Sequence, residues 1–278
     1  MLTEGYVNAL GFNYETQRRC RKSCRSSCRP VLNPVYSHTT SSLDSSVMQA
    51  RYLAFDLETS TGNVNTAFPL KVAAAALDEN LEEIDYMNIW VKPNLGGNGE
   101  DQPLLVEPEA MQVNRIDLVK HYKAAIPLWK ARIQFREFII KHTTHTYQLY
   151  EVGKSKIVCS EPLIPVGQFY SYDREVIIKH IDQDFGTTVS RRGLDTGIIG
   201  QFLKTAGKLP ENAGLSLRKQ AERVLNDVGN SGRSKEWKKN LRLNLDNAHD
   251  ALADVRLSVE VAKWQLALIK GVLVDETI

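Results

Sequence analysis

The chain has 278 residues, of which 42% are hydrophobic and 24% charged, and its formal net charge is +2 at pH 7. This composition is ordinary for a soluble globular protein with a sizeable core. The sequence contains no run of eighteen apolar residues, which a membrane-spanning helix would need. The N-terminus has no apolar h-region, and three of the four cysteines are bunched at Cys20, Cys24 and Cys28, which does not fit a secreted disulfide scaffold. We therefore expect a cytoplasmic protein that does not bind membranes.

The positive charge is concentrated at the N-terminus. Residues 1–47 contain six Lys or Arg against three Asp or Glu, whereas the rest of the chain contains 29 against 30. The stretch 20–46 is rich in Ser, Arg and Pro, which predicts a disordered tail over residues 1–47 and one folded domain over 48–278. The C-x3-C-x3-C spacing makes a metal site in the tail one possibility. A transit-like arm and a nucleic-acid-binding arm are further alternatives for the same residues.

The folded part begins with strands and then alternates between strands and helices. Apolar runs and alternation predict strands over 51–57, 70–78, 83–92 and 156–167, and a short strand at the start of 191–207. Helical spacing predicts helices, in whole or in part, over 107–122, 126–143, 173–185, the rest of 191–207, 216–229 and 246–271. Ser216 is an expected N-cap, and Gly229 and Gly271 are expected helix stops. This order predicts an α/β fold with a mixed sheet.

Two acids stand at the end of the first strand, in RYLAFDLETSTGN (residues 51–63). Strand alternation points Asp56 and Glu58 to the same face, where two partly desolvated carboxylates repel each other. A bound cation would remove this repulsion. The alternative is a strand that runs into an acidic, solvated turn.

Further candidates lie at two helix starts. Asp173 opens the helix that follows Val-Gly, where an ordinary capping or first-turn aspartate is the alternative. His249 and Asp254 are five residues apart, about 140° around an ideal helix and about 7.5 Å along it, so they do not suit a single ion. Asp254 can bind a cation while His249 accepts a proton near neutral pH. The alternative is a helix N-terminus capped by Asp246 with polar residues on its exposed face.

Together these motifs resemble the DEDDh exonucleases, which include proofreading subunits of bacterial replicative polymerases, ribonuclease T and oligoribonucleases. FDLET matches the family's Phe-Asp-x-Glu-Thr, residues 167–173 keep the register of Gly-His-Asn-x-x-Phe-Asp, and HDALADV matches the His-x4-Asp motif. PEAMQVNRI (108–116) resembles the segment beside the terminal nucleotide, and LDT (194–196) resembles the fifth strand. Phe169 departs from the family, because Asn is common there. We interpret it as a packing residue, with stacking on a base as the alternative.

The resemblance implies a ribonuclease H-like mixed five-stranded sheet flanked by helices, and a 3′–5′ exonuclease that uses two Mg2+ or Mn2+ ions. It implies that Asp56 bridges both ions, that Glu58 and Asp254 hold one, and that Asp173 supports the other. His249 is the implied general base. Thr59, Met111 and Asn114 are the implied contacts to the terminal nucleotide, which leaves as a nucleoside 5′-monophosphate.

A basic segment precedes the His249 motif. Residues 218–242 contain eight Lys or Arg against three Asp or Glu, with Trp237 among them. These charges could bind a nucleic-acid backbone and Trp237 could stack on a base, whereas a solvated helix and loop is the alternative. DNA is favoured over RNA as the substrate. An exoribonuclease and a catalytically silent nucleic-acid-binding module stay open, as do a polymerase partner and a homodimer.

Overall fold

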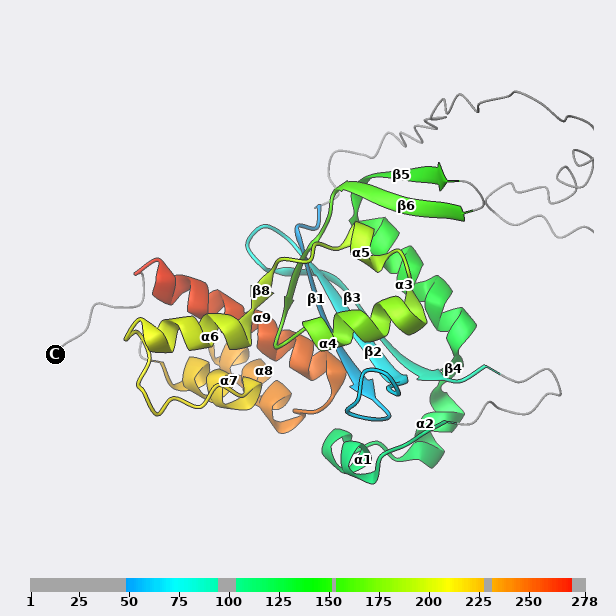
Figure 1. Cartoon of the computed structure of the whole chain (residues 1–278). Coiled ribbons are helices and arrows are strands. Elements are labelled where there is room, and N and C mark those ends of the chain that lie inside the picture. Colours follow the sequence, from blue (N-terminus) through cyan, green and yellow to red (C-terminus); the bar gives the residue numbers. More distant parts are fainter. Residues whose placement is uncertain (1–48, 95–103, 152–153, 228–231, 272–278) are drawn as a thin grey trace, which may run out of the picture. The chain divides into compact units, whose positions relative to one another are not determined.

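The computed structural model describes residues 49–94, 104–151, 154–227 and 232–271, shown in colour in Figure 1. The predicted tail over 1–47 with its three cysteines, and the predicted helix stop at Gly229, lie outside these residues. Within them no helix is both long enough and apolar enough to cross a membrane.

The central sheet has the strand order β4-β3-β2-β1-β7-β8. Its strands are β1 (Tyr52–Thr59), β2 (Pro69–Leu77), β3 (Glu83–Lys92), β4 (Ile126–Pro127), β7 (Ile164–Gly167) and β8 (Leu194–Asp195). β1, β2 and β3 pair antiparallel, whereas β7 joins β1 in parallel and β8 joins β7 in parallel. The predicted mixed α/β sheet is confirmed. It has six strands rather than five, because the two-residue β4 pairs with the end of β3.

Helices follow the strands, and two of them, α3 and α9, pack against opposite faces of the sheet. They are α1 (Pro108–Asn114), α2 (Leu118–Ala124), α3 (Leu128–His142), α4 (Ser171–Val176), α5 (Phe185–Thr188), α6 (Thr196–Thr205), α7 (Leu217–Asn226), α8 (Lys235–Asp246) and α9 (Ala251–Ile269), with a π-helical turn, η2 (Ile177–Ile181), after α4. The predicted N-cap is confirmed, since the Ser216 side chain accepts a hydrogen bond from the backbone N–H of Lys219.

The segment predicted as one strand over 156–167 is two strands. β6 (Lys154–Glu161) pairs with β5 (Thr144–Glu151), which the sequence did not indicate, in a separate two-stranded antiparallel sheet. β7 then begins at Ile164 and pairs with β1. Pro162 lies between β6 and β7, and a proline has no backbone N–H with which to continue a ladder.

The prediction of one long helix over 246–271 is wrong for its first residues. Asp246 is the last residue of α8, and α9 begins only at Ala251. Asp250 is the N-cap of α9, because its carboxylate accepts hydrogen bonds from the backbone N–H groups of Leu252 and Ala253. His249 therefore lies in the turn between two helices and not on the first turn of one.

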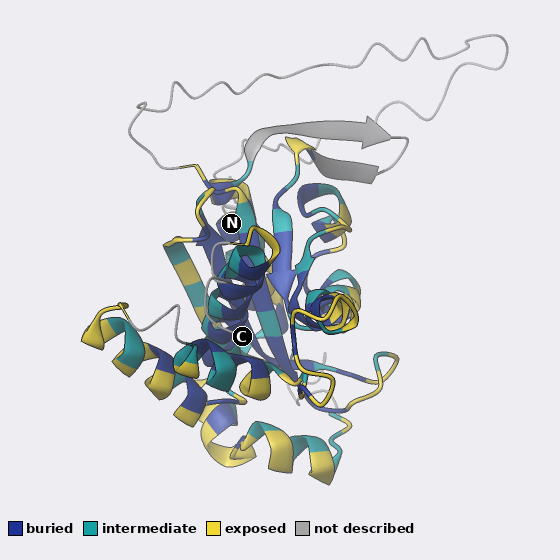
Figure 2. Cartoon of the chain, turned by 90° about the vertical axis from the view of Figure 1, so that its left-hand side faces the viewer, coloured by how far each residue is buried: buried dark blue, intermediate teal, exposed yellow. Residues whose placement is uncertain are grey.

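Each face of the sheet packs against a different set of helices (Figure 2). On one face, Phe55 of β1 packs with Phe135 of α3 and Phe185 of α5 in a cluster of large apolar side chains. On the other face, α9 packs on β1, β2 and β7 over small side chains such as Ala54 and Ala75. Figure 2 shows the buried strands between these helices.

Candidate active site

The end of β1 presents its two acids to α9. Ala54 belongs to the α9 cluster, whereas Phe55 and Leu57 belong to the α3 cluster, so the alternation of the strand is visible in the packing. Asp56 and Glu58 continue the Ala54 side. They therefore point to the face on which α9 lies, as the sequence predicts. Glu58 is only 5% exposed.

Helix α9 brings a third carboxylate to this pair. Asp254 lies in the first turn of α9, next to Val255, which packs on the sheet. Carboxylate oxygens of Asp56, Glu58 and Asp254 all lie within 4.8 Å of one another. Three acids that are far apart in the sequence thus form one cluster at the carboxyl end of the central strand.

A fourth acid comes from the neighbouring parallel strand. β7 ends at Gly167, and Asp173 follows in the first turn of α4, where it is buried. Its carboxylate accepts a hydrogen bond from the backbone of Leu57, the residue between Asp56 and Glu58. Its negative charge is one of the causes of the raised pKa of Asp56. Asp173 is therefore part of the same acidic site.

Burial and mutual repulsion make these four carboxylates hard to ionise. Burial, and then the charges of Asp173, Asp254 and Glu58, raise the pKa of Asp56 well above its ordinary value. Burial is also the main cause that raises the pKa of Glu58 to about 9, of Asp173 to about 8 and of Asp254 to about 6. A cluster of this kind is costly without a cation.

The donor set fits hard divalent cations. It consists of carboxylate oxygens, which Mg2+ and Mn2+ prefer, with neither thiol nor imidazole in the cluster of Asp56, Glu58 and Asp254. A bound dication would offset the repulsion that raises the pKa values. Both the geometry and the electrostatics of these residues therefore indicate a site for a divalent cation.

His249 lies beside this cluster in a strained turn. Its φ of 73° is in the left-handed region, and its backbone N–H donates hydrogen bonds to Asp254, with N–O distances of 3.2 and 3.4 Å. Its side chain is exposed. Partial burial, and then the positive charges of Arg115 and Arg218, lower the pKa of the imidazole. The neutral form, which can accept a proton, is thus favoured near neutral pH.

A buried lysine that the sequence analysis missed completes the site. Lys71 pairs with Glu58 across the β1–β2 ladder and is only 2% exposed. Its ammonium forms an ion pair with Asp250, the cap of α9, and lies 4.6 Å from the ring centroid of Trp90. The charge of Lys71 lowers the pKa of Glu58, against the raising effect of burial. A single lysine in the apolar segment PLKVAAAAL was the available signal.

Two of the three predicted nucleotide contacts have defined places. Asn114, at the end of α1, donates a hydrogen bond of 3.0 Å to the backbone oxygen of Thr59. The Thr59 hydroxyl donates to the backbone oxygen of Thr61 and lies 3.1 Å from the hydroxyl of Tyr172. Helix α1 is thereby fixed to the turn that follows the acids. Met111 lies on the same helix and is partly buried.

Trp237 lies elsewhere. It is near the start of α8, its indole N–H donates to Glu260 over 2.8 Å, and its ring packs with the apolar cluster of α6 to α9. Glu260 is six residues beyond Asp254 on α9, about 9 Å along the helix axis. The structure does not bring Trp237 to the carboxylates, and its stacking on a base stays a prediction.

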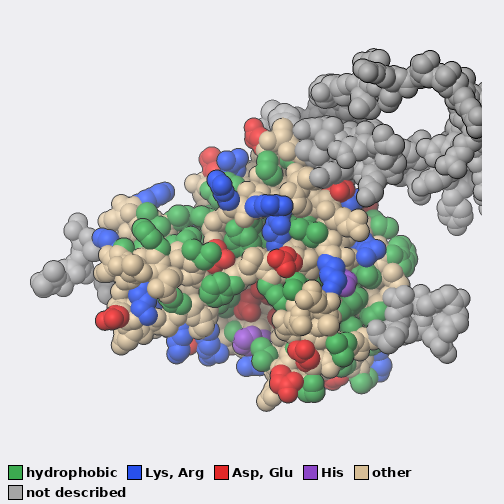
Figure 3. All heavy atoms as spheres, in the orientation of Figure 1, with side chains coloured by type: hydrophobic (Ala, Val, Ile, Leu, Met, Phe, Trp, Pro, Cys, Tyr) green, Lys and Arg blue, Asp and Glu red, His purple; other side chains and the backbone are tan. Residues whose placement is uncertain are grey.

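A cavity of about 180 Å³ opens directly beside the acids. Glu58 and Lys71 of the sheet form one wall, Asn114 forms another, and His249 and Asp250 form a third. Figure 3 shows, on one face of the protein, acidic side chains recessed next to a histidine, with Lys and Arg side chains close by. The cavity is thus bordered by groups that can bind anions as well as by the acids.

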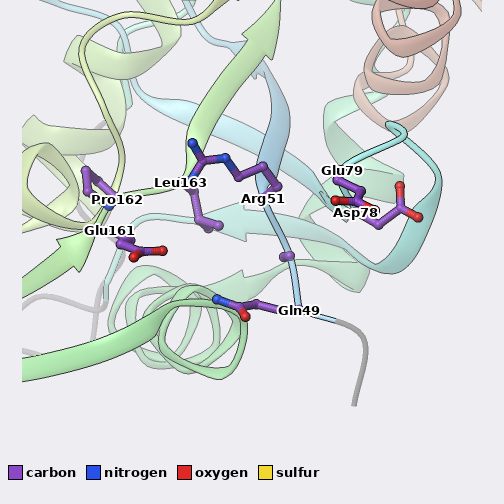
Figure 4. Close-up of a pocket in the computed structure, with 8 residues that line it drawn as sticks. Gln49, Arg51, Asp78, Glu79, Glu161, Pro162 and Leu163 are labelled. Carbon is purple, nitrogen blue, oxygen red and sulfur yellow. The ribbon is translucent and has the colours of Figure 1, made fainter. Parts of the chain in front are cut away.

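A larger cavity of about 400 Å³ lies at the opposite edge of the sheet (Figure 4). Arg51, which precedes β1, and Asp78, which follows β2, line it together with Glu161. Figure 4 shows these side chains coming from separate segments around the hollow. It holds none of the motif residues, so the candidate active site is the one at the carboxyl end of β1.

Comparison with known proteins supports the fold through structure alone. No protein-family model and no curated protein matches the chain. A zinc-bound complex of Escherichia coli ExoI with single-stranded DNA is 17% identical, with a TM-score of 0.54 over 80% of this chain and 42% of that chain. E. coli Exonuclease I in complex with a dA16 oligonucleotide is 15% identical, with a TM-score of 0.52 over 81% of this chain and 42% of that chain.

This chain spans 42% of the length of those two proteins. At such low identity, the similarity bears on the fold and leaves the activity to be argued from the site. The described part of the chain therefore has a mixed α/β fold similar to part of the exonuclease I structures.

Proposed function

We propose that this protein is a metal-dependent 3′–5′ exonuclease that hydrolyses single-stranded DNA. The observation that carries the proposal is the cluster of Asp56, Glu58 and Asp254, whose carboxylate oxygens lie within 4.8 Å of one another. Asp173 and His249 lie beside it, as the family's motifs require. The single-stranded DNA in the similar exonuclease I structures favours DNA over RNA.

The four carboxylates would hold two Mg2+ or Mn2+ ions, with Asp56 between them, Glu58 and Asp254 on one and Asp173 on the other. When bound, the ions supply Lewis-acid stabilisation of the charge that develops on the phosphate and on the attacking and leaving oxygens. The residues of the chain hold the carboxylates in place. β1 and α9 are rigid elements, and the N–H of His249 fixes the carboxylate of Asp254.

His249 would act as the general base. The neutral imidazole accepts a proton from the attacking water as the new P–O bond forms and the bond to the 3′ oxygen of the preceding nucleotide breaks. The released 3′ oxygen takes a proton from solvent, and the product is a nucleoside 5′-monophosphate. Lys71 and Asp250 hold the turn that carries His249, because the ion pair ties that turn to β2.

The direct test is cleavage of 5′-labelled, sequence-matched single-stranded DNA and RNA oligomers in Mg2+ or in EDTA. We expect stepwise shortening from the 3′ end in Mg2+, a higher rate on DNA, and no cleavage in EDTA. The same rate on RNA would instead indicate an exoribonuclease, since discrimination depends on contacts to the 2′ hydroxyl. Binding of the oligomers without cleavage by the wild-type protein would indicate a silent binding module.

Two variants separate the roles within the site. Asp56→Ala should abolish cleavage, because no other side chain can take the place between the ions. His249→Ala should slow turnover by about 10²- to 10⁴-fold, the usual contribution of a general base. Mn2+ titration by calorimetry should show weakened binding for Asp56→Ala and near-normal binding for His249→Ala. Full activity of the Asp56→Ala protein would exclude the proposal.

A further inference from the structure

Phe169 is an exposed aromatic side chain close to the acidic site that the motifs leave without a role. We propose that Phe169 is a stacking platform for one base of the single-stranded nucleic acid that enters the site. This inference rests on the proposed function, and it replaces the interpretation of Phe169 as a packing residue. The ring is 56% exposed, which is far more than a packing role requires.

The backbone of Phe169 is strained. Its φ is 53°, in the left-handed region, and a bulky side chain is rarely found there. Such a conformation persists only when the surroundings hold it, and it is concentrated at functional sites. Asn adopts this region far more readily than Phe. A large aromatic side chain at this position is thus unfavourable for folding and needs another reason.

Two contacts fix the direction of the ring. The backbone N–H of Phe169 donates a hydrogen bond of 3.2 Å to the carboxylate of Asp195, the N-cap of α6. The ring lies on Gly197, where an added Cβ would come within 2.5 Å of the ring carbons. One face of the ring is therefore supported by the start of α6, while more than half of the side chain stays open to solvent.

The support is rigid. The neighbouring side chain, Gln168, donates to the backbone oxygen of Leu215 over 2.8 Å and accepts hydrogen bonds from Thr196 and Gln220 over 2.7 and 3.1 Å. Thr196 and Gln220 are themselves buried. An aromatic ring on a fixed support loses little conformational freedom when it binds a partner.

The position of Phe169 favours nucleic acid as the partner. It stands two residues beyond β7 and four residues before Asp173, at the same edge of the sheet as Asp56 and Glu58. β7 is the direct neighbour of β1, and adjacent strands lie about 4.8 Å apart. A strand of nucleic acid whose terminal phosphate lies at the acids is therefore within reach of the ring. An aromatic face stacks on any base.

Two arginines lie near the candidate active site, and Arg115 lines its cavity together with Glu58 and His249. Arg115 and Arg218 are close enough to His249 to lower the pKa of its imidazole. Under the proposed function, the acids hold the scissile phosphate, Arg115 and Arg218 contact backbone phosphates and the ring of Phe169 stacks on a base. This combination is typical of sequence-independent binding of single strands.

Binding is measured with 5′-labelled oligothymidylate in Ca2+ in place of Mg2+, with the length of the oligomer checked on a gel. We expect Phe169→Ala and Phe169→Leu to raise the Kd by at least about 5-fold, and Phe169→Trp to stay close to the wild-type Kd. An aromatic residue is then required, because Leu is apolar but does not stack.

Single abasic positions in the last six nucleotides identify the stacked base. In the wild-type protein, one abasic position should weaken binding by the same factor as Phe169→Ala. In Phe169→Ala that position should have no further effect. Additive effects at every position would overturn the proposal, since the ring and a base would then not be in contact.

Phe169→Asn should change stability and binding in opposite directions. Asn relieves the backbone strain, so we expect the thermal midpoint to rise by about 2 °C or more while binding weakens. A lower midpoint with an unchanged Kd would show that Phe169 is a packing residue and would overturn the proposal. An unchanged Kd together with loss of self-association in light scattering would overturn it in favour of a protein contact.

Discussion

The two faces of the central sheet differ in the size of their side chains. On the face toward α3, Phe55 of β1 packs against the ring of Phe185, which also contacts the ring of Phe135. The face toward α9 presents Ala54, the residue before Phe55 on β1, and Ala75 of β2. Large side chains fill a wide gap, whereas small ones allow a helix to approach closely.

The two faces therefore contribute to different properties: one mainly to the stability of the fold, and the other to the position of the acidic residues. The aromatic face buries a large apolar area, which is the main source of folding free energy. The alanine face contributes less area, but it brings the first turn of α9 close enough to place Asp254 beside Asp56 and Glu58. Changes on the two faces should therefore have different consequences.

The largest effect on stability should come from Phe135→Ala. Phe135 is fully buried, so removal of its ring should cost about 3–5 kcal/mol of unfolding free energy, measured by urea denaturation. Mn2+ affinity of the folded protein should stay near the wild-type value, because no carboxylate moves. A clear loss of Mn2+ affinity would show that the two faces are coupled.

A smaller and more specific effect is expected from Ala75→Val, with Ala74→Val as its matched control. Both residues are fully buried in β2, Ala75 under α9 and Ala74 on the α3 face. Overpacking should cost each variant about 1–3 kcal/mol. Only Ala75→Val should lower Mn2+ affinity and cleavage rate, since it displaces α9. Equal losses in both variants would contradict the distinction between the faces.

The last prediction is a pH dependence of the stability of the metal-free protein. The pKa values of Glu58, Asp173 and Asp254 are raised to about 9, 8 and 6, so the folded state binds more protons than the unfolded state between about pH 4 and pH 9. In EDTA the thermal midpoint should therefore fall as the pH rises through this range.

Mg2+ should restore most stability at the alkaline end of that range, where the carboxylates are ionised. Asp173→Asn is the control, because it removes one of the raised pKa values and should flatten the pH profile in EDTA. Calorimetric scans from pH 5 to pH 9 check both statements. A midpoint that rises with pH in EDTA would contradict the pKa values of this cluster.

The sequence predicts those features that depend on short-range patterns of residues along the chain. Alternation alone places Asp56 and Glu58 on one face of β1, and the hydroxyl of Ser216 marks the start of α7. Helical spacing fails at His249, because Ala248 is buried in the turn and continues the apolar pattern across a break in the helix. The sharp turn shows only in the backbone, where the φ of His249 is positive.

Contacts between distant segments could not be predicted in the same way. Lys71 stands opposite Glu58 only because of the register of β1 with β2, which is set by long-range pairing. The π-helical turn after α4 has no clear local signal in an apolar segment, and the sequence analysis assigned no strand to residues 144–151. Phe169 was interpreted as a packing residue because its backbone strain and its exposure are properties of the folded chain.

The ion pair of Lys71 and Asp250 means that the chain carries part of its own counter-charge. A chelator can remove dissolved cations, but it cannot remove an ammonium that is covalently attached to the central sheet. New polypeptide emerging from a ribosome therefore meets a weaker electrostatic obstacle to folding than its acids alone would create. If the proposed ions bind, they therefore add to a charge balance that the fold already supplies in part.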